Sequence, residues 1–160
     1  MTPSLPLTAK HLSTLYEQDY YLWLEVTAQL LREGQLSALD AANLLEEIED
    51  LGRSEKRAVY SNLKILLVHL LKYRYQPEKR SNSWITSIVE HRHRLKKAFK
   101  ESPSLQPYFT ETLNECYQDA RELVAAETGL AIAEFPVESA FNPEEILNSD
   151  YLPNRSDRAV

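Results

Sequence analysis

Hydrophobic residues recur every three or four positions over most of the chain, which is the spacing of amphipathic helices. The first such stretch predicts a helix over residues 14–32, with Thr14 as N-cap and Glu17 completing a capping box. Its predicted buried stripe is Leu12, Tyr16, Tyr20, Trp23, Thr27, Leu30 and Leu31. Tyr21 lies about 100° away from this stripe, so we expect it at the surface.

Two helices are predicted in the next part of the chain. One follows Ser37 as its N-cap, and the other runs from about Ser54 to Tyr75, before Pro77. Gly52 separates them, because a glycine after a periodic segment is typical of a helix C-terminus. The first of the two has an apolar face formed by Ala41, Leu44, Leu45, Ile48 and Leu51. In the second, residues 65–71 are apolar nearly all round and are expected to be the most buried.

Two more long helices and a short one complete the prediction. The fourth helix follows the polar cluster at residues 81–83, and the fifth begins at residues 102–103 and ends before Gly129. The short helix has Asn142 as its N-cap and Glu145 completing a capping box. Short connections between successive helices favour antiparallel neighbours.

The pattern therefore predicts an all-α fold: an antiparallel bundle of four to five helices with an irregular C-terminal tail that carries one short helix. We expect a single domain over residues 1–160, with its core in about residues 14–128 and the tail in residues 129–160. Nothing resembles a hairpin turn between two alternating runs, which is the signal that strands would give.

Composition excludes several classes of protein. Of the 160 residues, 43% are hydrophobic and 26% are charged, which is ordinary for a soluble globular domain and excludes a disordered or membrane-spanning chain. The single cysteine, Cys116, excludes an internal disulfide framework and a thiolate zinc site, and its apolar stripe favours a buried side chain. The first residues lack a secretory pattern, so a cytoplasmic location without membrane contact is expected.

Charge is sorted along the chain. Residues 1–52 have a net charge of −7, residues 53–100 of +10, and residues 101–160 of −9. In one interpretation the acidic helices pack against the basic ones within the bundle. In the other, basic and aromatic side chains around the connection of the third and fourth helices bind nucleic acid, with phosphates on cations and bases on rings. The residues of that surface are Lys72, Arg74, Tyr75, Lys79, Arg80 and Trp84.

Histidine and glutamate in a helical bundle also raise a metal hypothesis. Inward-facing His69 and His91 could share an ion with Glu47 or Glu49. The alternative is that His91 is a core histidine hydrogen-bonded across helices. The Glu-x-x-His spacing that ends at His93 occurs once, whereas di-iron bundles need it twice. We therefore predict no metal, no other cofactor and no catalytic residue, and we keep this site only as a weak alternative.

One acidic side chain has an unusual sequence context. Asp19 lies near the edge of the first predicted helix's apolar stripe, among tyrosines. It could be an activated carboxylate. A structural role is favoured, in which a tyrosine hydroxyl or a lysine of the third predicted helix satisfies it.

Several motifs in order resemble one family. They are Leu15-Tyr-Glu-Gln-Asp-Tyr-Tyr-Leu-Trp-Leu24, Leu44-Leu-Glu-Glu-Ile-Glu-Asp-Leu-Gly-Arg-Ser-Glu-Lys-Arg57, His69-Leu-Leu-Lys-Tyr-Arg-Tyr-Gln-Pro77, Ser83-Trp84, Glu127-Thr-Gly129 and Tyr151-Leu-Pro153. Together they resemble the DUF29 family of small bacterial proteins, abundant in cyanobacteria. The resemblance implies an all-helical fold in a bacterial cytoplasm and transfers no site residue. Tyr73 departs from the pattern, in which tryptophan is more familiar.

The sequence favours a non-enzymatic interaction module, which either self-associates or docks onto a protein partner. The first helix holds more aromatic rings than one stripe can bury, and Tyr and Trp are common anchors at interfaces. Nucleic-acid binding through the basic hairpin is the first alternative, and a metal-dependent enzyme is the second.

Overall fold

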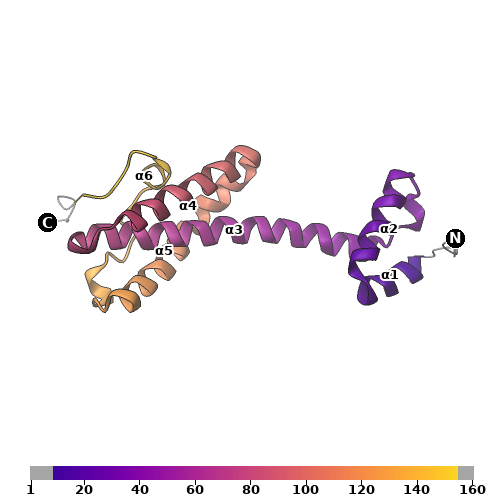
Figure 1. Ribbon diagram of the computed structural model, residues 1–160, viewed down its shortest axis with the longest axis horizontal. Coiled ribbons are helices and arrows are strands. Elements are labelled where there is room, and N and C mark those ends of the chain that lie inside the picture. Colours follow the sequence, from indigo (N-terminus) through magenta and orange to yellow (C-terminus); the bar gives the residue numbers. More distant parts are fainter. Residues whose placement is uncertain (1–8, 155–160) are drawn as a thin grey trace. The chain divides into compact units, whose positions relative to one another are not determined.

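The computed structural model describes residues 9–154, and its regular structure is entirely helical, as predicted (Figure 1). Six α-helices and four short 3₁₀ turns account for it, and no strand occurs in the described part of the chain. The α-helices are α1 (Ala9–Gln18), α2 (Tyr20–Arg32), α3 (Ala41–Tyr75), α4 (Asn82–Glu101), α5 (Gln106–Thr128) and α6 (Pro143–Leu147).

The described residues fall into two compact units. We call residues 9–54 the N-terminal unit and residues 55–154 the C-terminal unit. The N-terminal unit contains α1, α2 and the first part of α3, and the C-terminal unit contains the rest of α3 and the helices that follow it. Each unit has its own buried hydrophobic cluster. The single domain expected from the sequence stays a prediction.

A break at Asp19 corrects the predicted first helix, because α1 and α2 are separate. Asp19 has φ −149° and ψ 85°, outside the helical region, and its carboxylate accepts a hydrogen bond from the Leu22 amide at 3.0 Å. A short carboxylate competes for backbone N–H groups in this way and starts a new helix. Asp19 therefore has the structural role that the sequence favoured, with a backbone amide as its partner in place of the predicted tyrosine or lysine. Thr14 is not a cap: it lies inside α1 and donates to the Lys10 carbonyl.

Gly52 does not end a helix, which corrects the predicted division of α3. The helix continues for 35 residues through this position, and the positive-φ glycines among the described residues are Gly34 and Gly129. A helical glycine costs only about 1 kcal/mol relative to alanine, which helix-forming neighbours can offset.

The start of α3 also differs from the prediction. Asp40, not Ser37, accepts a hydrogen bond from the Asn43 amide, at 3.4 Å.

The second half of α3 forms the centre of the C-terminal unit, between α4 and α5. Leu66, Leu67, Leu70 and Leu71 are fully buried there, which confirms the predicted most buried segment. The start of α4 is also confirmed, with the Ser81 hydroxyl accepting from the Trp84 amide. A 3₁₀ turn at Pro103–Leu105 precedes α5, which therefore begins slightly later than predicted, and left-handed Gly129 ends α5 as expected.

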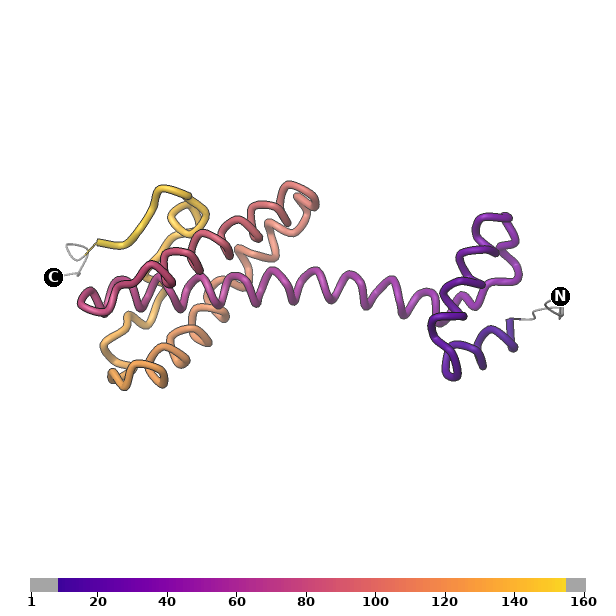
Figure 2. The backbone as a smooth tube through the Cα atoms, in the orientation of Figure 1, coloured from indigo at the N-terminus to yellow at the C-terminus, as the bar shows by residue number. Residues whose placement is uncertain are grey.

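The segment after Gly129 returns along the helices of the C-terminal unit (Figure 2). Its short helix α6 has the predicted Asn142 cap and capping box. Phe135, Phe141 and Ile146 are buried in the core of this unit. The sequence did not predict this contribution to the core, because an irregular segment has no periodicity that shows which side chains face inward.

Candidate interaction surface

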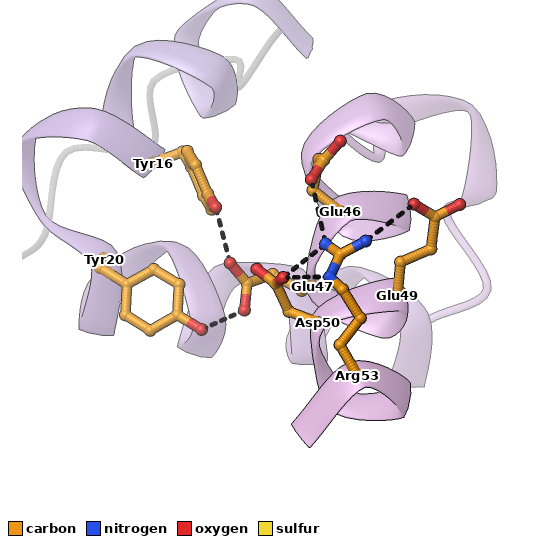
Figure 3. A network of polar contacts seen from close by, with 7 residues as sticks. All are labelled: Tyr16, Tyr20, Glu46, Glu47, Glu49, Asp50 and Arg53. Carbon is orange, nitrogen blue, oxygen red and sulfur yellow. Dashed lines mark hydrogen bonds and ion pairs between the residues drawn. The ribbon is translucent and has the colours of Figure 1, made fainter. Parts of the chain in front are cut away.

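Two tyrosines and one glutamate connect the three helices of the N-terminal unit (Figure 3). The Tyr16 hydroxyl on α1 donates to Glu47 Oε1 at 2.6 Å, and the Tyr20 hydroxyl on α2 donates to Glu47 Oε2 at 2.5 Å. The hydrogen bond to the Glu47 carboxylate raises the pKa of Tyr16 to about 12, and the second such bond also raises the pKa of Tyr20. Each bond favours the protonated phenol, because only that form can donate to the carboxylate. Glu47 on α3 therefore holds both rings against this helix.

Residues 46–53 of α3, about two turns of the helix, contain four carboxylates and one guanidinium. They are Glu46, Glu47, Glu49, Asp50 and Arg53. Arg53 Nε donates to Asp50 Oδ1 at 3.0 Å, and its terminal nitrogens lie 3.6 Å from a Glu46 oxygen and 3.7 Å from a Glu49 oxygen (Figure 3). These side chains are about half exposed, so each pair contributes little to stability. With Glu47, residues 46–53 have a net charge of −3.

Exposed hydrophobic side chains are concentrated in the N-terminal unit. It contains nine of the 13 large hydrophobic residues that the described chain exposes, although it has fewer than half as many described residues as the C-terminal unit. The nine are Tyr20, Tyr21, Leu22, Leu24, Leu31, Leu36, Leu45, Ile48 and Leu51. Tyr21 is at the surface, as predicted. The exposed apolar area of the described chain is therefore concentrated in this unit.

The interior of the N-terminal unit is small. Its buried hydrophobic side chains are Leu12, Trp23 and Leu30. Trp23 packs edge-on against Tyr16, with ring centroids 5.0 Å apart, and its indole N–H donates to Asp40 Oδ2 at 3.3 Å.

The two apolar faces predicted for this unit differ in burial. Most of the stripe predicted for the first helix is buried, but most of the apolar face predicted for the next helix is not. Leu45, Ile48 and Leu51 were expected inside and are exposed.

The cations of the predicted nucleic-acid surface bind other parts of the C-terminal unit. Lys72 Nζ lies 3.1 Å from a Glu127 oxygen and 5.1 Å from the centre of the Trp84 ring. Arg80 donates to the Tyr73 carbonyl at 2.7 Å and to the Pro153 carbonyl at 3.3 Å. The pairing of Lys72 with α5 is the kind of contact that the acidic-on-basic interpretation predicts.

The remaining residues of that predicted surface are divided between interior and exterior. Arg74 is buried and donates to the Ala140 carbonyl at 3.4 Å. The sequence suggested that Arg74 lies at the surface, and the structure places it in the interior. Tyr75 is half-buried and packs edge-on against Phe135, while Lys79 is exposed. A polyanion would have to displace several of these contacts, so we base the functional proposal on the N-terminal unit.

The structure brings His69 and His91 together through Ser87. The Nδ1 atoms of the two histidines lie 2.8 Å from the carbonyls of Ile65 and Ser87 respectively, and the Ser87 hydroxyl lies 3.5 Å from His69 Nδ1 and 3.4 Å from His91 Nδ1. A carbonyl only accepts, so each Nδ1 carries a proton. His91 is buried, as the core-histidine interpretation predicts, although its short bond is to its own helix.

The carboxylates of the metal hypothesis have other contacts. Glu47 accepts from two tyrosines, and Glu49 pairs with Arg53, all within the N-terminal unit. Within residues 9–154, no group of three or more His, Cys, Asp or Glu side chains is arranged to hold a metal ion. Glu90 and His93, the two ends of the Glu-x-x-His spacing, are both exposed. The metal hypothesis therefore gains no support from the geometry.

His69 makes the free energy of unfolding depend on pH. Burial, with smaller contributions from Lys72 and His91, lowers its pKa below the usual 6.5, against the opposing effects of the Ile65 carbonyl and Glu127. Between the lowered pKa and about 6.5 the unfolded chain binds more protons, so stability rises with pH in this interval and is lost as pH falls through it.

We therefore expect the wild type to lose stability between pH 7.5 and pH 5, and His69→Gln to lose less over the same range. Urea unfolding of both proteins measures this difference, and an NMR titration of the His69 ring measures its pKa directly. A His69 pKa at or above 6.5 would contradict the expectation.

Cys116 has the structural environment that its sequence context predicts. It is fully buried on α5, and burial raises the pKa of its thiol to about 12. A protonated, buried thiol is a poor nucleophile. The nearby Tyr60 hydroxyl donates to Asp119, which links α3 to α5. These groups therefore stabilise the C-terminal unit and are not candidates for catalysis.

The fold and surface together define an all-α protein with a well-packed C-terminal unit and an N-terminal unit that exposes much of its apolar surface. The chain belongs to the family described as Domain of unknown function DUF29, which matches residues 15–152 and confirms the resemblance seen in the motifs. No curated protein and no solved structure matches the chain. Among the described helices, none combines the length and the hydropathy needed to span a membrane.

Proposed function

We propose that the protein is a non-enzymatic interaction module, and that its N-terminal unit binds a protein partner or a second copy. The observation that carries the proposal is the concentration of exposed hydrophobic side chains on this unit. Large exposed apolar surfaces on soluble proteins are commonly binding sites, because covering them removes apolar area from water.

The small interior of the N-terminal unit supports the same proposal. Three buried hydrophobic side chains form its core, whereas the corresponding cluster of the C-terminal unit has twenty. A unit of fewer than 50 described residues buries too little surface for a large stability of its own. A bound partner would stabilise it by mass action, since binding to the folded form alone raises the free energy of unfolding.

We assign no catalytic role to the Ser87 cluster. The Ser87 hydroxyl is 3.4 Å or more from each histidine Nδ1, and each Nδ1 already donates to a backbone carbonyl. A general base needs an unprotonated nitrogen within about 3.2 Å of the nucleophile.

The proposal also includes a bacterial, particularly cyanobacterial, cytoplasmic setting, which the family resemblance and the scarcity of cysteine favour.

Site-specific crosslinking tests this proposal. A photoreactive phenylalanine analogue replaces Tyr21, which is 69% exposed, and in a matched control it replaces Val137 of the C-terminal unit, which is 68% exposed. We expect crosslinked products from the position of Tyr21 and not from that of Val137, in cells and with purified protein plus its recovered partner. A strictly monomeric protein that gives no more product at Tyr21 than at Val137 would overturn the proposal.

A further inference from the structure

The first turns of α3 present a hydrophobic stripe that no other described element of the N-terminal unit covers. Leu45, Ile48 and Leu51 are 56%, 58% and 67% exposed. At about 100° per residue they lie within an arc of about 120°, so they form one face of the helix. Residues spaced in this way are the anchors that a second helix recognises when it packs its own apolar face against them.

Two neighbouring features favour a helix as the occupant of this stripe. Gly52 lies on the same face, one turn beyond Ile48, and the space around its missing Cβ is open to at least 4 Å. A partner backbone can therefore approach closely at this point. The second feature is Tyr20. Glu47, which flanks the stripe, accepts from the Tyr20 hydroxyl and so holds this half-exposed ring near the stripe, and a partly exposed tyrosine is a favoured anchor at interfaces.

Charge around the stripe decides what kind of helix fits. Residues 46–53 have a net charge of −3, and Glu47 and Glu49 flank the stripe on its two sides. The described part of the N-terminal unit has nine carboxylates against three Lys and Arg residues, a net charge of −6. A second copy of this unit would bring the same negative field to the contact and be repelled, whereas a cationic segment would be attracted.

We infer that the partner presents a cationic amphipathic helix, which packs its apolar face on Leu45, Ile48 and Leu51 and places lysines or arginines beside the carboxylates of residues 46–50. This inference rests on the proposed function and specifies the partner's chemistry. The apolar contacts hold the complex together, and the charges select a basic partner and speed its association.

Two synthetic peptides test the inference with the full-length protein. Both have the same length and the same leucine positions at helical spacing, but the remaining positions are lysine in one and glutamate in the other. Fluorescence anisotropy measures their binding at 50 mM and 300 mM salt. We expect the lysine peptide to bind at least tenfold more tightly than the glutamate peptide, and to bind several-fold more weakly at the higher salt concentration.

Substitutions on the stripe separate docking from simple charge attraction. Ile48→Glu and Leu51→Glu each add a negative charge, so they would strengthen purely electrostatic binding of the lysine peptide. If the peptide packs on the stripe, each substitution weakens its binding about tenfold instead. Val137→Glu is the matched control and leaves the affinity unchanged. Because all three positions are exposed, circular dichroism should show unchanged helix content.

The outcomes distinguish this inference from the proposed function. Equal binding of both peptides, or binding that Ile48→Glu leaves unchanged or strengthens, overturns the cationic helix as the occupant. Crosslinking of Tyr21 variants into a dimer of this chain, lost on Ile48→Glu, overturns it in favour of a second copy and leaves the proposed function standing. A strictly monomeric protein that binds neither peptide and gives no more crosslinked product at Tyr21 than at Val137 overturns the proposed function itself.

Discussion

Replacing Trp23 with alanine is expected to unfold the N-terminal unit and to leave the C-terminal unit folded. Trp23 is fully buried, packs against Tyr16 and donates to Asp40. Truncating a buried tryptophan typically costs about 3–5 kcal/mol. At the usual stability per residue, a unit of this size has about 2–7 kcal/mol in total. The loss is therefore comparable with everything that keeps the N-terminal unit folded.

Hydrogen exchange measured by mass spectrometry checks this prediction. Amides of α1 and α2 in Trp23→Ala should lose protection, while those of α4 and α5 keep it. The chain has two tryptophans, so the fluorescence of the remaining one, Trp84, reports on the C-terminal unit alone in this variant. Tyr21→Ala is the control on the same helix and should change stability by less than about 0.5 kcal/mol, because Tyr21 is exposed. Unchanged protection of α1 and α2 would contradict the prediction.

Replacing Arg92 with alanine is expected to release the C-terminal segment from α4. Arg92 is 2% exposed, and it donates to the carbonyls of Ile146 at 2.8 Å, Tyr151 at 3.2 Å and Glu145 at 3.4 Å. Each hydrogen bond from a charged donor is worth about 1.5–3 kcal/mol, and the alanine variant leaves three acceptors without this donor. Because these contributions are not additive, we expect a loss of about 3–5 kcal/mol.

Urea unfolding measures this loss, and limited proteolysis shows where it occurs. Cleavage in residues 135–152 should become faster in Arg92→Ala before the rest of the unit unfolds. Arg92→Lys should fall between the alanine variant and the wild type, since an ammonium cannot reproduce the guanidinium fork. Arg94→Ala is the control on the same helix: Arg94 is exposed and paired with Glu90, so its removal should have little effect. Equal stability of Arg92→Ala and Arg94→Ala would argue against the anchoring role.

The signals that predicted correctly are those that depend on neighbouring residues alone. Ser81 and Asn142 start their helices because each side chain caps the amide three positions ahead, and Gly129 ends α5 because it adopts positive φ. The errors at Asp19 and Gly52 come from the same kind of signal. At both positions helix continuation and helix termination differ by about 1 kcal/mol, so a cap or a glycine alone does not decide between them.

Candidate functional residues were harder to predict, because their roles depend on distant parts of the chain. The sequence suggested a cationic surface around Arg74 and Arg80, but carbonyls more than 60 residues away accept from both side chains. Arg92 had no sequence signal, since a buried guanidinium is recognised only by the carbonyls around it. The stripe of Leu45, Ile48 and Leu51 was visible as an apolar face, but its exposure was not predicted.

The order of the amino acids by itself determined that the chain is helical, where most helices end, and which faces of them are apolar, because hydrogen bonding and side-chain spacing along a helix are local. Only the tertiary structure decided which apolar faces are covered, because coverage depends on which other segments pack against a helix. Around residues 66–71 several segments do so, and the leucines are buried. Around residues 45–51 the rest of the N-terminal unit supplies no cover, so a face of similar composition stays exposed.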